Sequence, residues 1–387
     1  MRLLRILALA FVAGATSPLV SIAGTTPEQQ LKSAVDRLRA GQGGEAFQQI
    51  EKLVQQEPNF HLAQLIYGEL LAARSGAKGL SASADSQNPQ LKALLEEAQL
   101  RLSPPLVPAS SLPAPLLQVA SSRKNLIVVD LSKARLYLFE NEAGRLRIVR
   151  QHYAAMGRNG AGKSTKGDLR TPIGIYTITG FLSDDGLPEM YGSGAFPLSY
   201  PNRWDQKLGR SGYGIWLHGV PRDTYSRAPR SSEGCVTMAN EDLLALKPYI
   251  AAGQTPVVLA EKLDWLEPAK LAQQRDPLLK QIEAWRTRWS ARDTEGYLGY
   301  YASNFSTDGM DRSAFAAHKR RVNATKKSIN VKLRELELFR YPGEENLVMA
   351  QFIQDYKSDN FAVSGLKQQY WKRQSDGSWK IVLEESR

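Results

Sequence analysis

The sequence predicts three folded parts: an N-terminal helical region, a central mainly β domain and a C-terminal α+β domain. Three observations support this prediction. The chain has 387 residues, which is too long for one ordinary domain. A stretch rich in proline and serine divides it at residues 104–123. The apolar residues follow helical spacing before that stretch and alternate after it.

The first 23 residues have the pattern of a cleaved export signal. Arg2 and Arg5 precede a short apolar stretch, and Ser21 and Ala23 form a small-x-small cleavage pattern. We therefore expect residues 1–23 to be a signal peptide and the mature protein to be periplasmic. Since no later apolar run reaches the roughly 18 residues of a membrane helix, we expect no membrane span after cleavage.

Residues 24–103 are predicted to be helical and similar to a tetratricopeptide unit. Thr26 and Pro27 provide a hydroxyl cap followed by proline at the first helical position. Glycines at 41–44 and Pro58 then separate three segments with helical spacing. Because such a region usually packs against another protein surface, a protein partner or a dimer contact is expected here. Residues 104–123 are expected to be a linker.

Residues 124–262 are expected to form the mainly β domain, because short β-branched or alternating runs are punctuated by turn residues. A charged connector is expected at 263–275. Residues 276–387 begin with a helix to which we assign Trp285, Trp289 and, further along, Tyr297, Tyr300 and Tyr301. Strands are predicted to follow at 331–339, 347–356, 365–373 and 379–383.

Composition limits the chemistry. Cys235 is the only cysteine, so neither an internal disulfide nor a Cys₂His₂ or Cys₄ zinc site is available. The four histidines are scattered, and we expect no metal and no cofactor. The net charge of +11 would attract polyanions, either nucleic acid or an anionic cell-wall polymer, or it simply maintains solubility. The export signal and the lack of an aromatic–basic recognition block argue against nucleic acid.

The sequence around Cys235 has the parts of a thiol active site. A cysteine nucleophile needs a base, and His218, at the end of a predicted strand, is the only histidine near it in the chain. Gly234 would let the backbone approach a substrate, and the N–H groups of Gly234 and Cys235 could face a carbonyl oxygen. Taken alone, Cys235 is more simply interpreted as a buried, inert cysteine, and His218 as a core histidine.

The combination resembles the YkuD-type L,D-transpeptidase catalytic domain. That family carries His-Gly or His-Ser, a spacer, and then Ser/Thr-x-Gly-Cys, here His218-Gly219 and residues 232–235. Residues 166–176, Lys-Gly-Asp-Leu-Arg-Thr-Pro-Ile-Gly-Ile-Tyr, also match the family's Thr-Pro-x-Gly-x-Tyr/Phe block. The resemblance implies an enzyme acting on peptidoglycan stem peptides in the periplasm.

The resemblance also implies roles for single residues. Cys235 would attack the carbonyl at the L-centre of meso-diaminopimelate in a tetrapeptide stem and expel D-alanine. His218 would be the base, and the Gly219 carbonyl would orient its ring. The N–H groups of Gly234 and Cys235 would form the oxyanion hole. Ser232 would shape the loop or contact substrate, and the candidates for binding the substrate's carboxylates are Arg170, Arg222 and Arg230.

The sequence departs from the family at two positions. Glu233 stands where many members have histidine, and Thr237 where many have arginine or asparagine. A carboxylate near a thiol raises the thiol pKa, so we expect Glu233 to point away or to pair with an arginine.

A narrower resemblance concerns residues 166–176 and the C-terminal part. The block resembles the branch that contains L,D-carboxypeptidases of helical bacteria and an amidase that frees lipoprotein from peptidoglycan. Residues 276–387 resemble the nuclear-transport-factor-2-like cone, which can be a pocket, a dimer surface or a second enzyme. Asp293 is the candidate acid of such an enzyme, although an acid on a helix surface is the simpler interpretation.

Three functional hypotheses therefore remain. The first is a cysteine acyl transferase, with either an amine acceptor, giving cross-links, or water, giving a carboxypeptidase or amidase. The second is a non-catalytic scaffold that binds the cell wall. The third, nucleic-acid binding, is disfavoured by the export signal.

Overall fold

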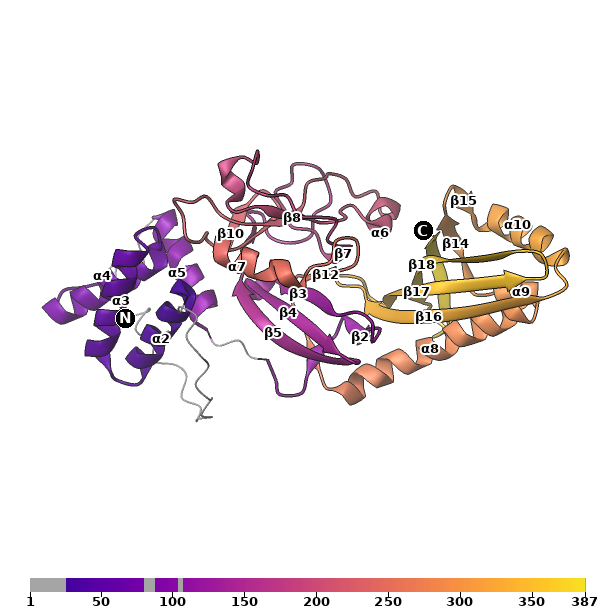
Figure 1. Ribbon diagram of the computed structural model, residues 1–387, viewed down its shortest axis with the longest axis horizontal. Coiled ribbons are helices and arrows are strands. Elements are labelled where there is room, and N and C mark those ends of the chain that lie inside the picture. Colours follow the sequence, from indigo (N-terminus) through magenta and orange to yellow (C-terminus); the bar gives the residue numbers. More distant parts are fainter. Residues whose placement is uncertain (1–25, 80–87, 104–106, 387) are drawn as a thin grey trace.

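The three predicted parts follow one another along the long axis of the molecule (Figure 1). The computed structural model describes residues 26–79, 88–103 and 107–386. The predicted signal peptide, residues 1–23, lies outside these ranges. Within them, no helix combines the length and the apolar character needed to cross a membrane.

Four helices form the N-terminal bundle: α2 (Pro27–Arg39), α3 (Gly43–Gln56), α4 (His61–Ser75) and α5 (Pro89–Leu102). Thr26 begins α2 with a capping box, in which its hydroxyl accepts the Gln29 N–H and its own N–H is bound by the Gln29 side chain. Apolar side chains from all four helices meet in one core, including Leu31, Ile50 and Ile66. The helical prediction is confirmed, and the tetratricopeptide resemblance stays a prediction.

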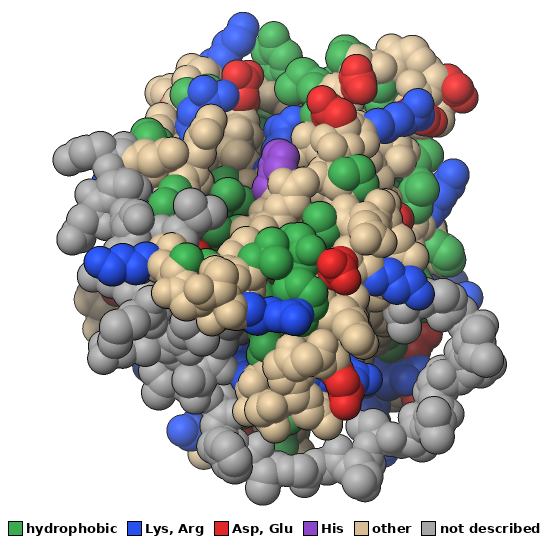
Figure 2. Space-filling view, turned by 90° about the vertical axis from the view of Figure 1, so that its left-hand side faces the viewer, with side chains coloured by type: hydrophobic (Ala, Val, Ile, Leu, Met, Phe, Trp, Pro, Cys, Tyr) green, Lys and Arg blue, Asp and Glu red, His purple; other side chains and the backbone are tan. Residues whose placement is uncertain are grey.

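The bundle presents a surface of mixed charge. Figure 2 shows this end of the molecule, where basic and acidic side chains are interspersed among apolar ones. No single-sign patch dominates the visible face, so the positive net charge is not concentrated there.

The central domain is built on three sheets. The largest has the order β5-β4-β3-β12-β7, and β12 runs parallel to β3 but antiparallel to β7. Its strands are β3 (Asn125–Asp130), β4 (Arg135–Glu142), β5 (Arg145–Tyr153), β7 (Gly174–Thr177) and β12 (Pro256–Ala260). A second sheet has the order β11-β9-β8, with β8 (Ala195–Pro197), β9 (Trp216–His218) and β11 (Val236–Thr237).

The third sheet of the central domain pairs β6 (Met156–Gly157) with β10 (Arg230–Ser232) in parallel. One apolar core joins the largest sheet to the second sheet, and it contains Ile127, Leu217 and Val236. Short helices complete the domain: α6 (Arg203–Lys207), α7 (Asn240–Leu246), and the 3-10 turns η2 (Leu131–Lys133), η3 (Glu189–Tyr191) and η4 (Lys247–Tyr249).

The C-terminal domain wraps one sheet around helices, as an α+β cone requires (Figure 1). The sheet order is β15-β14-β19-β18-β17-β16-β2. Its long strands are β16 (Ile329–Arg340), β17 (Leu347–Ser358), β18 (Ala362–Arg373) and β19 (Trp379–Ser386), so all four predicted strands are present. The concave side holds the fully buried side chains of Trp285, Tyr297 and Trp371. The remaining elements are α8 (Pro268–Ser290), α9 (Thr294–Leu298), α10 (Arg312–Ala324), β14 (Tyr301–Thr307) and β15 (Met310–Asp311).

The expectation of a linker at 104–123 and a connector at 263–275 needs correction. β1 (Leu112–Pro113) pairs with β13 (Trp265–Leu266), and β2 (Leu116–Gln118) pairs with β16 of the C-terminal sheet. α8 already begins at Pro268, inside the expected connector. Proline is tolerated in short edge strands such as β1, and local composition does not reveal a strand partner more than 200 residues away.

Two details of the C-terminal prediction also change. Tyr301, assigned to the first helix, begins β14, because α9 ends at Leu298 and Gly299 follows. Asp293 caps α9 by accepting the Gly296 N–H and pairs with Arg288, with 41% of its side chain exposed. It is therefore a helix-capping acid and not an acid inside the cone.

Candidate active site

Two short parallel strands bring His218 and Cys235 together. β11 lies beside β9 with Val236 opposite Leu217 and Thr237 opposite His218. Extending this register by one residue places Cys235 next to Trp216. The sixteen residues that lie between His218 and Cys235 in the sequence therefore return the chain to its starting strand.

The alternation of side chains along the strands puts both reactive groups on the same face. Leu217 and Val236 are fully buried in the apolar core of the central domain. Their neighbours Trp216, His218 and Cys235 must then point to the opposite face. The Tyr191 ring supports this, because its centroid lies 4.8 Å from that of Trp216 and 4.9 Å from that of His218.

The thiol of Cys235 is held in a largely apolar position. Burial raises its pKa to about 11, and the Trp216 N–H, Lys163 and Arg227 oppose this rise only in part. Its Sγ donates to the carbonyl oxygen of Gly214 at 3.3 Å. The resting group is therefore a thiol and not a thiolate at neutral pH.

The imidazole of His218 is neutral as well. Burial lowers its pKa to about 4, and Arg227 adds to this effect while the Gly219 carbonyl opposes it. Nδ1 lies 2.7 Å from the Gly219 carbonyl oxygen. Since a carbonyl can only accept, Nδ1 carries the proton, and Nε2 has the free lone pair that a general base needs.

The loop before Cys235 is shaped by Ser232 and Gly234. The Ser232 hydroxyl donates to the Cys235 carbonyl at 2.6 Å and accepts the Gly234 N–H at 3.2 Å. Gly234 has φ +129°, and a Cβ there would lie 2.8 Å from the carbonyl oxygen of Arg170. Ser232 is 3% exposed, so it shapes the loop. Because the Gly234 N–H is already bound, it is not free for the expected oxyanion hole in this conformation.

Asn240, which the sequence analysis missed, fixes the turn after His218. Its Oδ1 accepts the N–H groups of Ser193 and Val220, and its Nδ2 donates to the Val220 carbonyl at 2.9 Å. A Cβ on Gly219 would lie 2.0 Å from this Oδ1, so only glycine fits. Asn240 therefore holds the carbonyl that orients the imidazole. The only sequence signal was its position five residues after Cys235.

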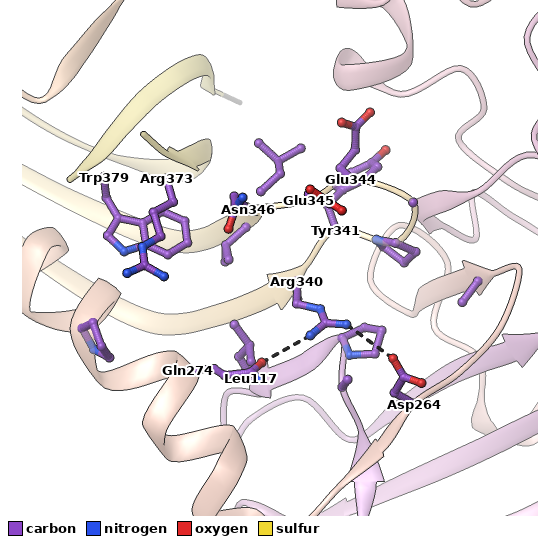
Figure 3. Close-up of a pocket in the computed structure, with 18 of the residues that line it drawn as sticks. Leu117, Asp264, Gln274, Arg340, Tyr341, Glu344, Glu345, Asn346, Arg373 and Trp379 are labelled. Carbon is purple, nitrogen blue, oxygen red and sulfur yellow. Dashed lines mark hydrogen bonds and ion pairs between the residues drawn. The ribbon is translucent and has the colours of Figure 1, made fainter. Parts of the chain in front are cut away.

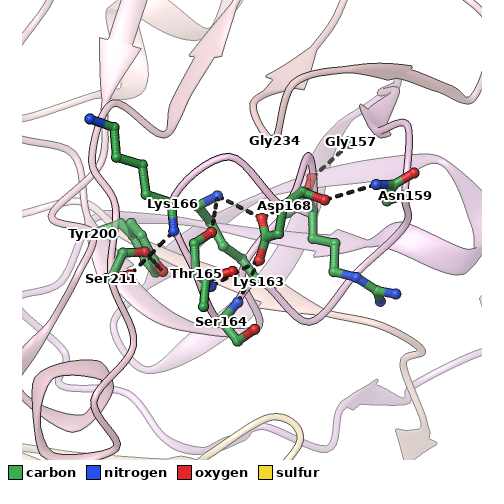
Figure 4. A network of polar contacts seen from close by, with 12 residues as sticks. Gly157, Asn159, Lys163, Ser164, Thr165, Lys166, Asp168, Tyr200, Ser211 and Gly234 are labelled. Atoms are coloured by element: carbon green, nitrogen blue, oxygen red, sulfur yellow. Dashed lines mark hydrogen bonds and ion pairs between the residues drawn. The ribbon is translucent and has the colours of Figure 1, made fainter.

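The second matching block forms a polar network behind the cysteine loop (Figure 4). Asp168 accepts from Lys163 Nζ at 2.8 Å and from the N–H groups of Ser164, Thr165 and Arg170. Burial raises the Asp168 pKa, but these donors outweigh it and lower the pKa to about 2. Lys163 is 5% exposed. The network fixes the chain whose Arg170 carbonyl lies against Gly234.

Comparison with known families agrees with this geometry. Residues 124–259 match the L,D-transpeptidase catalytic domain, the segment that holds both reactive residues and the Asp168 network. The chain carries an L,D-transpeptidase catalytic domain. Residues 277–385 match the Cds6 C-terminal NTF2-like domain. This match concerns the catalytic domain and not the whole chain.

Two solved structures are similar to this chain over more than two thirds of its length. Bd1075 of Bdellovibrio bacteriovorus is 28% identical with a TM-score of 0.63, over 71% of this chain and 98% of that chain. The helical cell shape determining protein Pgp2 of Campylobacter jejuni is 27% identical with a TM-score of 0.58, over 69% of this chain and 94% of that chain. No curated protein matches the chain.

The three candidate arginines of the L,D-transpeptidase domain have different surroundings. Arg222 pairs with Asp184, and Arg230 pairs with Glu96 of helix α5 at 2.7 Å. Arg170 donates to the Ala161 carbonyl at 2.9 Å and, within the described residues, has no carboxylate partner. Only Arg170 therefore keeps a positive charge that no acidic side chain balances.

The departures from the family pattern also have a place in the domain. Glu233 is exposed and pairs with Arg158 at 3.3 Å, which is the arginine pairing that the sequence analysis gave as one alternative. Thr237 is 1% exposed and lies opposite His218 in the strand register. Its hydroxyl has no hydrogen-bond partner among the residues that the structure describes.

A groove of about 1240 Å³ separates the L,D-transpeptidase domain from the NTF2-like domain (Figure 3). Arg340 crosses it and contacts Gln274 at 3.4 Å and Asp264 at 3.9 Å. Trp379 and Arg373 stand together at one end. Neither Cys235 nor His218 lines this groove, so the groove and the pair of Cys235 and His218 are separate features.

Proposed function

We propose that the protein is an exported cysteine enzyme that trims peptidoglycan tetrapeptide stems and releases D-alanine, with water as the acyl acceptor. The observation that carries the choice of water is the resemblance of residues 166–176 to the L,D-carboxypeptidase branch. The similarity to Pgp2, a helical cell shape determining protein, over 69% of this chain supports a role in the cell wall.

In the first step, the Cys235 thiol gives its proton to His218 Nε2 as Sγ attacks the carbonyl at the L-centre of diaminopimelate. Both groups start neutral, since burial raises the thiol pKa and lowers the imidazole pKa. An S–C bond forms, the C–N bond to D-alanine breaks, and His218 returns the proton to the leaving amine. In the second step, water attacks the thioester, again with His218 as base, and the tripeptide stem leaves.

The oxyanion of each step needs donors in the cysteine loop. We propose the Cys235 N–H as the main donor, with the Gly234 N–H joining only if it releases the Ser232 hydroxyl. For the carboxylates of the stem we propose Arg170 first, because Arg222 and Arg230 are paired with acids.

An amine acceptor is the second candidate function. The match to the L,D-transpeptidase family favours it, since the thioester is the shared intermediate and a diaminopimelate amine of a second stem would replace water.

The test is the mature protein, from about residue 24, with purified tetrapeptide muropeptides, read by mass spectrometry beside Cys235→Ala. A control variant in the same loop is Ser231→Ala, whose hydroxyl only bonds the Ala228 carbonyl. Tripeptide and free D-alanine, present with the control and absent with Cys235→Ala, would support the proposal. Diaminopimelate–diaminopimelate dimers would replace it by transpeptidation. No product from the unsubstituted protein would favour a wall-linked protein substrate or a non-catalytic scaffold.

A further inference from the structure

The N-terminal bundle holds the loop that joins His218 to Cys235. This loop, residues 219–229, leaves β9 after His218 and returns at β10. Tyr225 at its tip is 9% exposed and belongs to the apolar core of the bundle. Its ring lies 4.2 Å from that of Phe60, and its N–H donates to the Asn59 carbonyl at 3.3 Å. Two residues of the catalytic domain, Tyr225 and Ala239, are thus part of the core of another domain.

A buried polar network fixes the next residue of the loop. The Ser226 hydroxyl donates to Glu97 Oε1 at 2.7 Å. Glu97 is 2% exposed and pairs with Arg101 at 3.2 Å, and Arg101 also pairs with Glu28 of α2. Removing one partner from a buried ion pair costs free energy, because the other charge is left buried and unpaired. The network therefore gives the loop a defined position.

The catalytic domain holds the loop from its other side. The Tyr153 hydroxyl donates to the Arg227 carbonyl at 2.9 Å. The Arg101 guanidinium lies 4.0 Å from the centre of the Tyr153 ring, so the same arginine braces both contacts. Residues 225–227 are therefore clamped between α5 and β5.

The clamped segment carries Arg227, which acts on both reactive groups. Among the residues that the structure describes, Arg227 is the side-chain cation that influences the pKa of both His218 and Cys235. It also donates to the Met190 carbonyl at 3.4 Å, next to Tyr191, whose ring covers His218. If the loop were displaced, the Arg227 charge would move and the Tyr191 ring would no longer cover His218.

We propose that the N-terminal bundle is a positioning element of the active site: it seats Tyr225 and Ser226 and thereby holds residues 219–229 over His218 and Cys235. Both matching families begin after residue 123, so the bundle lies outside them. The kinetic part of this inference rests on the proposed function, whereas its chemical part concerns only the thiol.

The groups that surround Cys235 and His218 give the direction in which each pKa should change when the loop is loosened. Lys163, Arg227 and Glu233 act on Cys235, and Arg227 and Tyr191 lie at His218. Burial is the largest cause of both shifts, so water admitted by a loose loop lowers the thiol pKa from about 11 and raises the imidazole pKa from about 4. Moving the Arg227 charge away would raise the thiol pKa, but by less than the added water lowers it.

The experiment uses the full mature chain with Tyr225→Ala and Ser226→Ala combined. Alkylation of the single thiol is followed against pH, and kcat and KM are measured on tetrapeptide muropeptides. We expect the alkylation midpoint to fall by about one pH unit or more and kcat to fall about tenfold or more with little change in KM. Tyr225→Phe keeps the aromatic stack and should restore both readings. Arg37→Gln, at an exposed position of α2, is the matched control within the bundle.

An alkylation profile and a kcat that both equal those of the unsubstituted protein would overturn the proposal. A shifted profile in a protein that never turns over muropeptides would support the positioning role and reject the proposed function. If the double variant loses its cooperative unfolding transition, Ser226→Ala alone decides, because it leaves the stack on Phe60 in place.

Discussion

At the scale of single residues, the proposed catalytic pair of Cys235 and His218 has the charge state that proton transfer requires, and it is not a standing ion pair. Cys235 and His218 are both neutral at rest because burial disfavours each charged form. Lys163, which is bound to Asp168, and Arg227 lower the thiol pKa, but by less than burial raises it. The single thiol is thereby protected from oxidation, since the thiolate is the reactive form.

The pH dependence of turnover should show this arrangement. The free enzyme needs neutral His218 as base, so kcat/KM should stay high as pH falls and decline only near pH 4. Folding stability should fall earlier, because the unfolded chain binds the proton near 6.5 and the folded one only near 4. A pH profile of kcat/KM measured alongside unfolding checks this. An acid limb near 6.5 would contradict it and indicate a hydrated imidazole.

Sequence reasoning found the residues that carry fixed motifs and missed the ones that loops bring in. Cys235, His218 and Gly219 follow from local patterns. Lys163 and Arg227 have no such pattern, because they reach the thiol through loops with no hydrophobic period. The Gly234 N–H was expected in the oxyanion hole, but the Ser232 hydroxyl binds it, a contact that spacing alone does not reveal.

At the scale of elements, the segment from Lys163 to Thr171 is held by one carboxylate. Asp168 receives one ammonium group and three backbone N–H groups, so this stretch keeps its shape without regular secondary structure. Its Arg170 carbonyl in turn sets the position of Gly234.

Asp168→Asn should therefore weaken both the fold and the site. The Asp168 and Lys163 side chains are 13% and 4% exposed, so the change leaves a buried ammonium unpaired, at a cost of about 3 kcal/mol. Urea unfolding and kcat on muropeptides measure the two effects. The exposed Asp185→Asn is the control, and equal midpoints for the two variants would contradict the assigned role.

Elements with strong periodicity were predictable, and elements with remote partners were not. β16 begins with alternating buried and exposed residues, and the turn between β18 and β19 contains Gly377, which has φ +82°. β14 was missed because the tyrosines at 297 and 301 continue helical spacing past Gly299. β1 and β2 were missed because Pro113 in β1 and Pro115 between the two strands favour a linker.

At the scale of the whole molecule, the NTF2-like domain is incomplete without residues that precede the catalytic domain. β2 covers the free edge of β16, and Leu116 is 2% exposed in the core shared by the two domains. An uncovered edge of a long strand pairs readily with another chain.

A fragment of residues 263–387 should consequently self-associate and melt at a lower temperature than the same domain in the full chain. Size-exclusion chromatography and thermal unfolding measure this, and a peptide of residues 110–121 added in excess should restore the monomer. A monomeric fragment with an unchanged melting temperature would show that β2 is dispensable.

The pairing of β2 with β16 has a consequence for the order in which the parts of the molecule fold. β2 is synthesised before the catalytic domain, but its partner β16 emerges only after it. The catalytic domain can fold while β2 is still unpaired. The final step then pairs β2, which is synthesised early, with β16, which is synthesised late. Residues 114, 115 and 117 line the groove between the two domains. That groove is therefore a product of chain completion, and any ligand that requires it distinguishes finished molecules from unfinished ones.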